Sequence, residues 1–282
     1  MPDTVGQADI RGLNVNRVVT GFALQSFIMK PLLRVTGSSK WQERYYAETA
    51  ADLTAVSPMV IEGVPRLANF PHLSTSWTQK NSYHKKHAGE TVISWEDAIS
   101  NDIPVIERSL LRIGRAIAKS VDDDVYQQFT TGSYDDILSG AASAAWANGA
   151  ANPVNDVSEA VRAIWSNNYD ANSAVLLLNP HSYRDLLRKV IGSGASWQAV
   201  AGEKLMNGTV GQFLGLRVIV SNSVTASGAT VMIPNETGNY LELESMQTQT
   251  IPDPGIKYTI RSWEIGLVQV TNPKAVYQIT SV

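Results

Sequence analysis

One stripe of apolar residues dominates the pattern of the chain between residues 102 and 129. Its members recur at spacings of three and four, the period of one helical face: Ile106, Leu110, Ile113, Ile117, Val121 and Val125. Asp102 is positioned to cap this helix, and Pro104 suits its first turn. About 27 residues at 1.5 Å each give a helix roughly 40 Å long, which indicates a spine along one side of the molecule.

A second pattern, between residues 174 and 190, joins a buried strand directly to a helix. Residues 176–178 form a short apolar run, as expected for a strand covered on both faces. Asn179 is a preferred helix cap, and Pro180 fits the first helical position because its nitrogen carries no hydrogen to leave unpaired. Apolar residues then follow on one helical face: Tyr183, Leu186, Leu187 and Val190.

The first hundred residues carry weaker patterns. Residues 1–56 mix basic and apolar positions without a single period, which predicts an arm that needs a surface to lie on. An ordinary N-terminal subdomain is the alternative. Residues 57–100 carry short β-like runs around the polar stretch 74–89, which predicts a long hairpin with a basic tip. Because an isolated hairpin is marginal in water, a projecting one needs a partner.

The second half of the chain alternates helix and strand signals. Small residues between 130 and 155 indicate a linker. Asp156 and Glu159 resemble a capping box at the start of a short helix. Apolar runs at 215–220, at 229–233 and from 258 onwards predict further strands. Together with the spine helix, these elements predict an α+β fold.

The composition narrows the classes of function. The 282 residues, 44% of them hydrophobic, are enough for a sizeable core. They include no cysteine, which excludes disulfides and cysteine-based zinc sites. The formal net charge of −3 argues against a nucleic-acid-binding module. No apolar run approaches the roughly 18 residues of a membrane-spanning helix, so no membrane partner is expected.

Possible metal ligands occur in two places. His84 and His87 have a spacing that a metal ion accepts on a helix, but two lysines lie between them, which favours a solvated basic loop. The run 122–124 consists of aspartates that point in different directions on a helix, which favours a solvated face. We therefore predict no metal site.

Catalytic motifs are equally sparse. His181 and Ser182 are adjacent but have no oriented partner in the sequence, which favours a role in a turn. No glycine-rich phosphate loop and no nucleophile-elbow motif is found. We predict no catalytic residue and no cofactor. A soluble α/β enzyme remains an alternative, without residues to populate its pocket.

The order of these landmarks resembles one family of shell proteins. A basic arm, a long hairpin and a spine helix precede the strand–Asn179–Pro180–helix unit, the segment 211–222 (GQFLGLRVIVSN) and the segment 270–275 (VTNPKA). This order is similar to that of the major capsid proteins of tailed bacteriophages, which have the Hong Kong 97-like fold shared by encapsulin shells. The likeness covers nearly the whole chain, and its specificity lies in order and spacing.

The resemblance implies a division of the chain into parts. They are an N-terminal arm (1–56), an extended loop (57–100), a peripheral domain with the spine helix (101–150), an axial domain (151–255) and return strands of the peripheral domain (256–282). It implies a structural protein of the virion that self-assembles into pentamers and hexamers of an icosahedral shell around double-stranded DNA. The alternative is an encapsulin-type nanocompartment enclosing a cargo enzyme.

The resemblance also implies partners and contact residues. A scaffold, a portal and decoration proteins are expected during assembly in the host cytoplasm, with either a processed arm or a separate scaffold. Packaged DNA is expected to make weak, non-specific contacts. Basic residues are the candidates for contacts between subunits: Arg11, Arg17, Lys80, Lys85, Lys86, Arg108, Arg112 and Arg115. Some relatives join a loop lysine to an asparagine with the help of a glutamate, and Lys80, Lys85 or Lys86 with Asn272 would be the pair here. Because no matching glutamate aligns and most members of the family do not crosslink, contacts of these lysines with acidic residues of the adjacent subunit are favoured.

Overall fold

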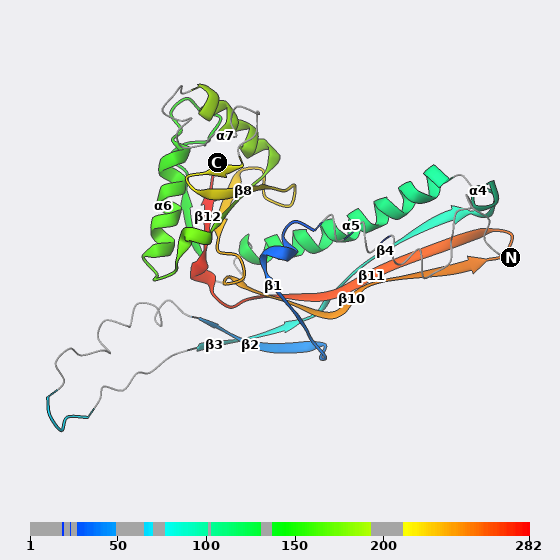
Figure 1. Cartoon of the computed structure of the whole chain (residues 1–282), viewed down its shortest axis with the longest axis horizontal. Helices are drawn as coiled ribbons and strands as arrows, with labels where there is room; N and C mark the ends of the chain where they lie inside the picture. Colours follow the sequence, from blue (N-terminus) through cyan, green and yellow to red (C-terminus); the bar gives the residue numbers. More distant parts are fainter. Residues whose placement is uncertain are drawn as a thin grey trace.

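The computed structural model of the chain describes residues 27–48, 65–69, 77–100, 103–130, 137–192 and 211–282, together with Val19 and Ala23. Over these residues the strands form a long four-stranded sheet, a six-stranded sheet and a two-stranded ribbon (Figure 1). Among the described helices, none has the length and apolar character needed to cross a membrane. The combination of separate helices with mostly antiparallel strands confirms the predicted α+β fold.

The long sheet has the strand order β1–β10–β11–β4. Its strands are β1 (Arg34–Gly37), β10 (Gly238–Asp253), β11 (Lys257–Val270) and β4 (Lys85–Ser94). β11 runs antiparallel to both β10 and β4, whereas β1 runs parallel to β10. Gly255 has a φ of +79° in the turn between β10 and β11, a conformation that glycine adopts without steric cost. The short helix α4 (Trp95–Ser100) follows β4.

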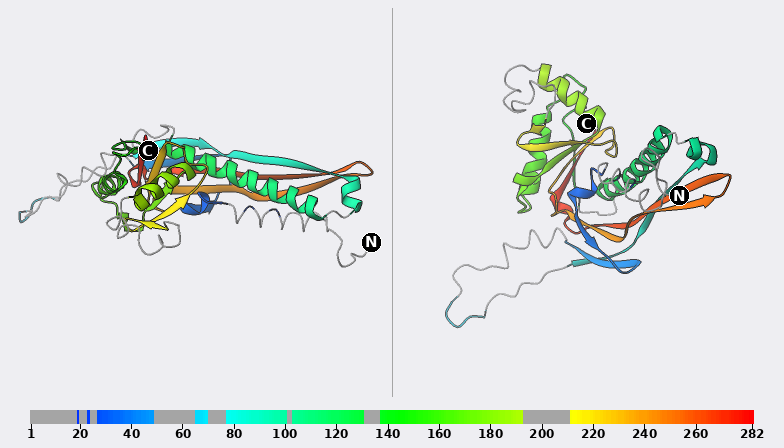
Figure 2. Two further views of the ribbon diagram at one scale, coloured as in Figure 1. Left: turned by 90° about the horizontal axis from the view of Figure 1, so that it is seen from above. Right: turned by 45° about the vertical axis from the view of Figure 1, so that its right-hand side comes forward.

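Helix α5 (Ile103–Thr130) is the predicted spine and lies along one face of the long sheet (Figure 2). Its apolar stripe is buried as the spacing predicts, over Leu110, Ile113, Ile117, Val121 and Val125. The sheet residue Gly89 of β4 lies next to this stripe, and a Cβ there would be in ordinary van der Waals contact with Ile113 Cγ1 at 3.7 Å. The predicted cap Asp102 and the side chain of Ile106 lie outside the described residues.

The six-stranded sheet has the order β5–β12–β9–β6–β8–β7. Its strands are β5 (Leu138–Ala141), β12 (Val276–Thr280), β9 (Gly228–Met232), β6 (Val175–Leu178), β8 (Leu216–Val220) and β7 (Gln212–Phe213). Helices α6 (Pro153–Trp165) and α7 (Pro180–Gly192) pack beside it (Figure 1). The short turn η2 (Ala171–Ser173) leads from α6 into β6, and η4 (Pro273–Ala275) leads from β11 into β12. The two faces of this sheet contribute to different cores: Leu176 and Leu178 pack with α6 and α7, whereas Val175 and Leu177 belong to the core that contains the apolar stripe of α5.

The predicted strand–Asn–Pro–helix unit is confirmed. All four residues of β6 are buried, and α7 begins at Pro180. The side chain of Asn179 accepts a hydrogen bond from the backbone N–H of His181 at 2.9 Å, and its amide donates to Val224 O. The cap therefore fixes the start of α7 and ties it to the loop after β8.

Sheet membership differs from the predicted grouping of the chain. β5 lies before residue 150 and β12 lies after residue 255, yet both belong to the six-stranded sheet, where β12 pairs with β5 and β9. Conversely, β10 begins at Gly238 in the long sheet. The chain thus crosses between the two sheets several times, which residue-by-residue patterns do not reveal. The assignment of peripheral and axial roles to these parts stays a prediction.

The ribbon consists of β2 (Gln42–Glu48) and β3 (Trp77–Tyr83), paired antiparallel. The prediction of a hairpin with its tip at 74–89 is wrong at the level of strand pairing. β3 ends at Tyr83, and β4 begins two residues later as the edge of a different sheet. The polar residues of this stretch predicted a loop tip. In the structure they include the first residues of β4, where His87 faces α5. The ribbon instead joins the end of the predicted arm to the predicted extended loop.

Candidate assembly surface

The ribbon β2–β3 presents one covered face and one open face. Tyr45 and Ala47 are buried on the first face. Tyr46 and Tyr83 are 57% and 59% exposed, and Trp41 at the base of the ribbon is 52% exposed. A two-stranded ribbon is marginally stable alone, and large aromatic side chains are rarely left in water without a function. The open face therefore has the character of a contact surface.

Two of the predicted contact lysines already have partners within the chain. Lys85 forms an ion pair with Asp124 of α5. Lys86, on the opposite side of β4, lies over the ring of Trp263 at 5.5 Å from its centroid. Lys80 is half-buried on the covered face of the ribbon, opposite Tyr45. These lysines therefore first serve to hold the subunit's own elements together.

The predicted arginines of the spine helix lie in solvent. Arg108, Arg112 and Arg115 are exposed and form no ion pair with any other described residue. Their spacing of four and three residues places them on one stripe of α5, away from its buried stripe. Arg11 and Arg17 lie outside the described residues. The stripe is the part of the predicted set that remains available for another molecule.

The aspartates 122–124 are not a solvated face. Asp122 is buried, and its carboxylate accepts hydrogen bonds from the backbone N–H groups of Ile28, Met29 and Lys30 at 2.8, 3.0 and 3.1 Å. Burial raises the pKa of Asp122, and the three N–H donors oppose that rise. We call residues 27–33 the strap, because this carboxylate fastens them to the spine helix. Only Asp123 is solvated, paired with Lys119.

Lys30 attaches the same strap to the long sheet. Its ammonium group lies 2.7 Å from Glu264 Oε1 and also pairs with Glu242. Tyr240 donates a hydrogen bond to Glu264 at 2.9 Å, and burial raises the pKa of this tyrosine. The Lys30 ammonium also lies 4.7 Å from the centroid of the Phe27 ring, which adds a cation–π contact. One cluster thus joins the strap, β10 and β11.

His84, between β3 and β4, and His87 of β4 are also placed differently from the prediction. His84 and His87 are buried rather than solvated in a loop tip. His84 Nδ1 lies 3.1 Å from Trp41 O, and His87 Nδ1 lies 2.9 Å from Ser120 Oγ. Within the described part of the chain, no three histidine or acidic side chains gather as metal ligands. His72 lies outside the described residues.

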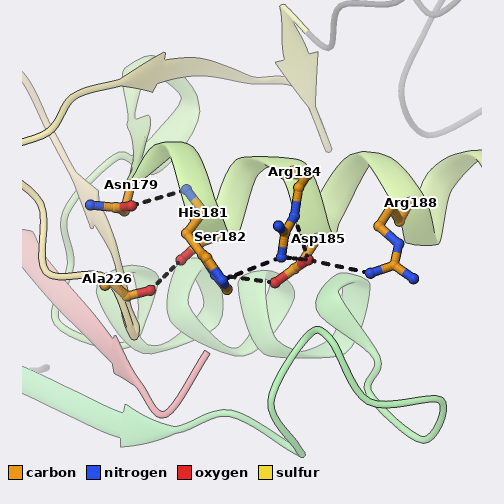
Figure 3. Close-up of polar contacts among 7 residues, drawn as sticks. All are labelled: Asn179, His181, Ser182, Arg184, Asp185, Arg188 and Ala226. Carbon is orange, nitrogen blue, oxygen red and sulfur yellow. Dashed lines mark hydrogen bonds and ion pairs between the residues drawn. The ribbon is translucent and has the colours of Figure 1, made fainter.

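His181 has the oriented partner that sequence reasoning missed. Its Nδ1 lies 3.3 Å from Asp185 Oδ2, one helical turn further along α7 (Figure 3). However, its Nε2 faces the guanidinium of Arg184, and the hydroxyl of Ser182 donates to Ala226 O at 3.1 Å. The serine and histidine therefore do not form a nucleophile–base pair. The i, i+4 spacing of a histidine and an aspartate was the available signal.

Asp185 is the centre of this group on α7. It is only 4% exposed, and its Oδ1 accepts hydrogen bonds from Arg184, with Arg188 at 3.9 Å (Figure 3). Lys189, on the same helix, donates to Gly149 O at 2.8 Å. The cluster holds α7 to the loop before α6 and leaves two arginines on the surface of the six-stranded part.

Asp156 has a different role from the predicted capping box. The cap of α6 is Asn152, whose side chain accepts from Asn155 N, with Pro153 at the first helical position. Asp156 lies buried one turn later and accepts hydrogen bonds from Ser143 N and Trp146 Nε1, both at 2.9 Å. It anchors the loop between β5 and α6, a long-range contact without a sequence motif.

We expect Asp156→Ala to lower the free energy of unfolding by about 2–3 kcal/mol, because two buried donors lose their acceptor. Urea denaturation measures the change. The matched control is Glu159→Ala on the exposed side of the same helix, for which we expect a nearly unchanged midpoint. Equal midpoints for the two variants would contradict the anchoring role.

Comparison with protein families decides the identity of the chain. The sequence profile of a family described as phage capsid protein matches residues 79–279. The chain belongs to this phage capsid family. The match covers the spine helix, the long sheet except β1 and nearly all of the six-stranded sheet, and thus most of the architecture described above. No curated protein sequence matches the chain significantly.

Solved structures show that this capsid protein has the Hong Kong 97-like fold. The virus-like particle protein from Pyrococcus furiosus has a TM-score of 0.67 at 14% identity, over 96% of this chain and 100% of its own. The capsid of cyanophage P-SCSP1u has a TM-score of 0.65 at 13% identity, over 91% and 88%. The SrpI encapsulin of Synechococcus elongatus has a TM-score of 0.58 at 12% identity, over 100% and 92%.

The family and fold confirm the resemblance inferred from the order of sequence landmarks. The capsid protein is a structural component of a virion, and its relatives form oligomeric shells. Asn272, the acceptor considered for a lysine crosslink, donates its side-chain amide to Glu236 O at 2.8 Å.

Proposed function

We propose that this major capsid protein assembles through pentamers and hexamers into an icosahedral shell that encloses the double-stranded DNA genome of a tailed virus. The observation that carries the proposal is the ribbon β2–β3, which lies at the margin of the subunit (Figure 2). The aromatic side chains on its open face are exposed. A second copy of the chain is the partner, because a shell offers the same surface at every position. The role is structural rather than enzymatic, and assembly takes place in the host cytoplasm.

Charge supports contacts between copies rather than tight binding of DNA. The chain carries a net charge of −3, and its described clusters neutralise many of its own cations. The exposed stripe Arg108, Arg112 and Arg115 is available for acidic groups of a neighbouring copy. Each exposed pair contributes about 0–1 kcal/mol, but a shell repeats every contact many times. Weak contacts with phosphate allow the genome to be packaged and released.

A scaffold, a portal and decoration proteins complete the proposal as partners of assembly. An encapsulin-type shell with an enzyme as cargo is the second candidate, since SrpI encapsulin shares the fold. The contents of purified particles distinguish a virus shell from an encapsulin-type shell. Nuclease-protected DNA supports the virus, whereas a co-purifying protein held by a short peptide on the inner wall supports the nanocompartment.

The ribbon provides the test of how copies join. We expect the double variant Tyr46→Ser and Tyr83→Ser to raise the protein concentration needed for assembly by about tenfold or more, because two aromatic anchors are lost. The melting temperature should stay close to that of the parent, since both side chains are mostly exposed. Light scattering across a concentration series measures assembly.

The matched control is Trp165→Ser, which removes an equally exposed aromatic side chain from α6 in the other part of the subunit. We expect this control to assemble at the parent concentration. Unchanged assembly of the ribbon variant, or an equal loss in both variants, would show that the ribbon face is not the specific contact.

A further inference from the structure

Two buried polar atoms without hydrogen-bond partners among the described residues lie in the seam between the spine helix and the long sheet. His87 of β4 and Glu264 of β11 are directly opposite each other in the strand register, and both face α5. His87 Nδ1 lies 2.9 Å from Ser120 Oγ of α5. In the described structure, His87 Nε2 and Glu264 Oε2 are buried without a hydrogen-bond partner. Buried polar atoms without partners are rare, so this pair requires an explanation.

The charges around this seam are unequal. The carboxylates are those of Asp124, Glu242 and Glu264, and the ammonium groups are those of Lys30 and Lys85. Three negative charges and two positive charges leave one negative charge in excess. The hydroxyls of Ser120 and Tyr240 complete the polar surroundings of His87 from α5 and β10. A proton on His87 would balance the charge, because the imidazolium carries one positive charge.

The present arrangement nevertheless has no place for the second N–H of an imidazolium. A charged histidine donates from both ring nitrogens, and only Nδ1 has a partner here. The nearest carboxylate oxygen to Nε2 is Asp124 Oδ2 at 4.0 Å, which is beyond hydrogen-bonding distance. The excess negative charge therefore attracts a proton that the geometry of the closed seam cannot accommodate.

We propose that His87 is an acid-sensitive joint: the neutral imidazole keeps the seam between α5, β4 and β11 closed, and its protonation opens the seam so that Nε2 gains an acceptor. The strap follows this movement, because Glu264 is both the strand partner of His87 and the carboxylate that holds Lys30. One protonation thus controls how firmly the N-terminal strap, the spine helix and the long sheet are joined. The inference concerns a single subunit and does not depend on the proposed shell.

The direction of the pH dependence follows from burial. Desolvation lowers the pKa of His87 below its ordinary value of 6.5, while Asp124 and Glu264 raise it and Lys85 lowers it further. A base whose pKa is lower in the closed state than in the open state favours the closed state at high pH. The closed seam is therefore fully stable above about pH 6.5 and loses stability as the pH falls below that value.

Hydrogen exchange of the full chain tests the joint. We expect protection of segments 27–33 and 84–90 to fall about tenfold or more between roughly pH 7.5 and 5, after correction for the intrinsic rate of exchange. Helix α6, whose buried apolar residues Val157, Ala160 and Ile164 all lie in the other core, should keep its protection. In His87→Gln, which cannot be protonated, the two segments should keep their protection across the same range. Light scattering at each pH verifies that the assembly state is constant.

Two further variants give shifts of opposite sign and do not depend on replacing the histidine. Asp124→Asn removes an attraction for the proton and should move the midpoint of the opening to lower pH. Lys85→Gln removes a repulsion and should move the midpoint to higher pH. Lys86→Gln, on the opposite face of β4, is the matched control and should leave the midpoint unchanged. Shifts of the same sign, or a parent protein whose protection does not change with pH, would overturn the proposal.

Discussion

Lys30→Met is expected to lower the free energy of unfolding by about 3–5 kcal/mol, because it leaves Glu264 as a buried carboxylate without its cation. Glu264 is fully buried and Lys30 is almost so, which prevents water from replacing the lost partner. The methyl group of methionine fills part of the space, so the loss reflects charge more than packing. Urea denaturation followed by circular dichroism measures the change.

Two comparisons isolate the charge effect. Lys119→Met removes the cation of an exposed ion pair on α5. It should change the free energy of unfolding by at most about 1 kcal/mol. The double variant Lys30→Met and Glu264→Gln should be less destabilised than Lys30→Met alone, because no uncompensated charge remains. A loss below 1 kcal/mol for Lys30→Met, or no recovery in the double variant, would contradict the account of the strap.

Gly238→Ala is the second substitution with a large expected effect. A Cβ at this position would overlap the carbonyl oxygen of Gln269 and would lie 3.1 Å from Val270 Cα, both in the backbone of the paired strand β11. Backbone atoms of a sheet cannot turn aside as a flexible side chain can. We expect a loss of about 3 kcal/mol, at the upper end of the usual range for overpacking.

Gly37→Ala is the matched control for this position. Gly37 lies in β1, the other neighbour of β10, and a Cβ there would have no atom within 4 Å. We expect no loss of stability for this variant. The melting temperatures of both variants, measured by thermal unfolding, test the close approach of the two strands at Gly238. Equal melting temperatures would show that this close approach does not exist.

Local signals account for the elements that sequence reasoning identified. The stripe of α5 and the unit around Asn179 and Pro180 are determined by residues within one or two turns of each other, so their spacing alone is informative. The order of such units was enough to indicate the fold and the family, although each motif by itself is weak.

Long-range pairing accounts for what sequence reasoning missed. The residues that pair with β3 lie 29 to 41 positions upstream in β2, and the partner of β4 lies far downstream in β11. Nothing in the local polarity of residues 74–89 distinguishes a loop tip from an edge strand that faces a helix. The environment of charged residues was predicted wrongly for the same reason. Asp122, for example, is buried by the strap, which lies more than ninety residues away in the sequence.

The candidate surface was predicted only in part. The exposure of the stripe beginning at Arg108 follows from helical periodicity, because charged residues occupy the face opposite the apolar stripe. The internal partners of Lys85 and Lys86 do not follow, since they depend on the packing of β4 against α5 and β11. The exposed aromatic face of the ribbon became recognisable only when the register of β2 and β3 was known.

Negative-stain electron microscopy of the purified full chain, with light scattering to measure its mass, tests the central claim most directly. The account predicts closed shells or rings of five and six subunits, formed above a threshold concentration. Protein that stays monomeric at high concentration, under crowding and with scaffold protein added would contradict the account, and the exposed ribbon face would then need another explanation.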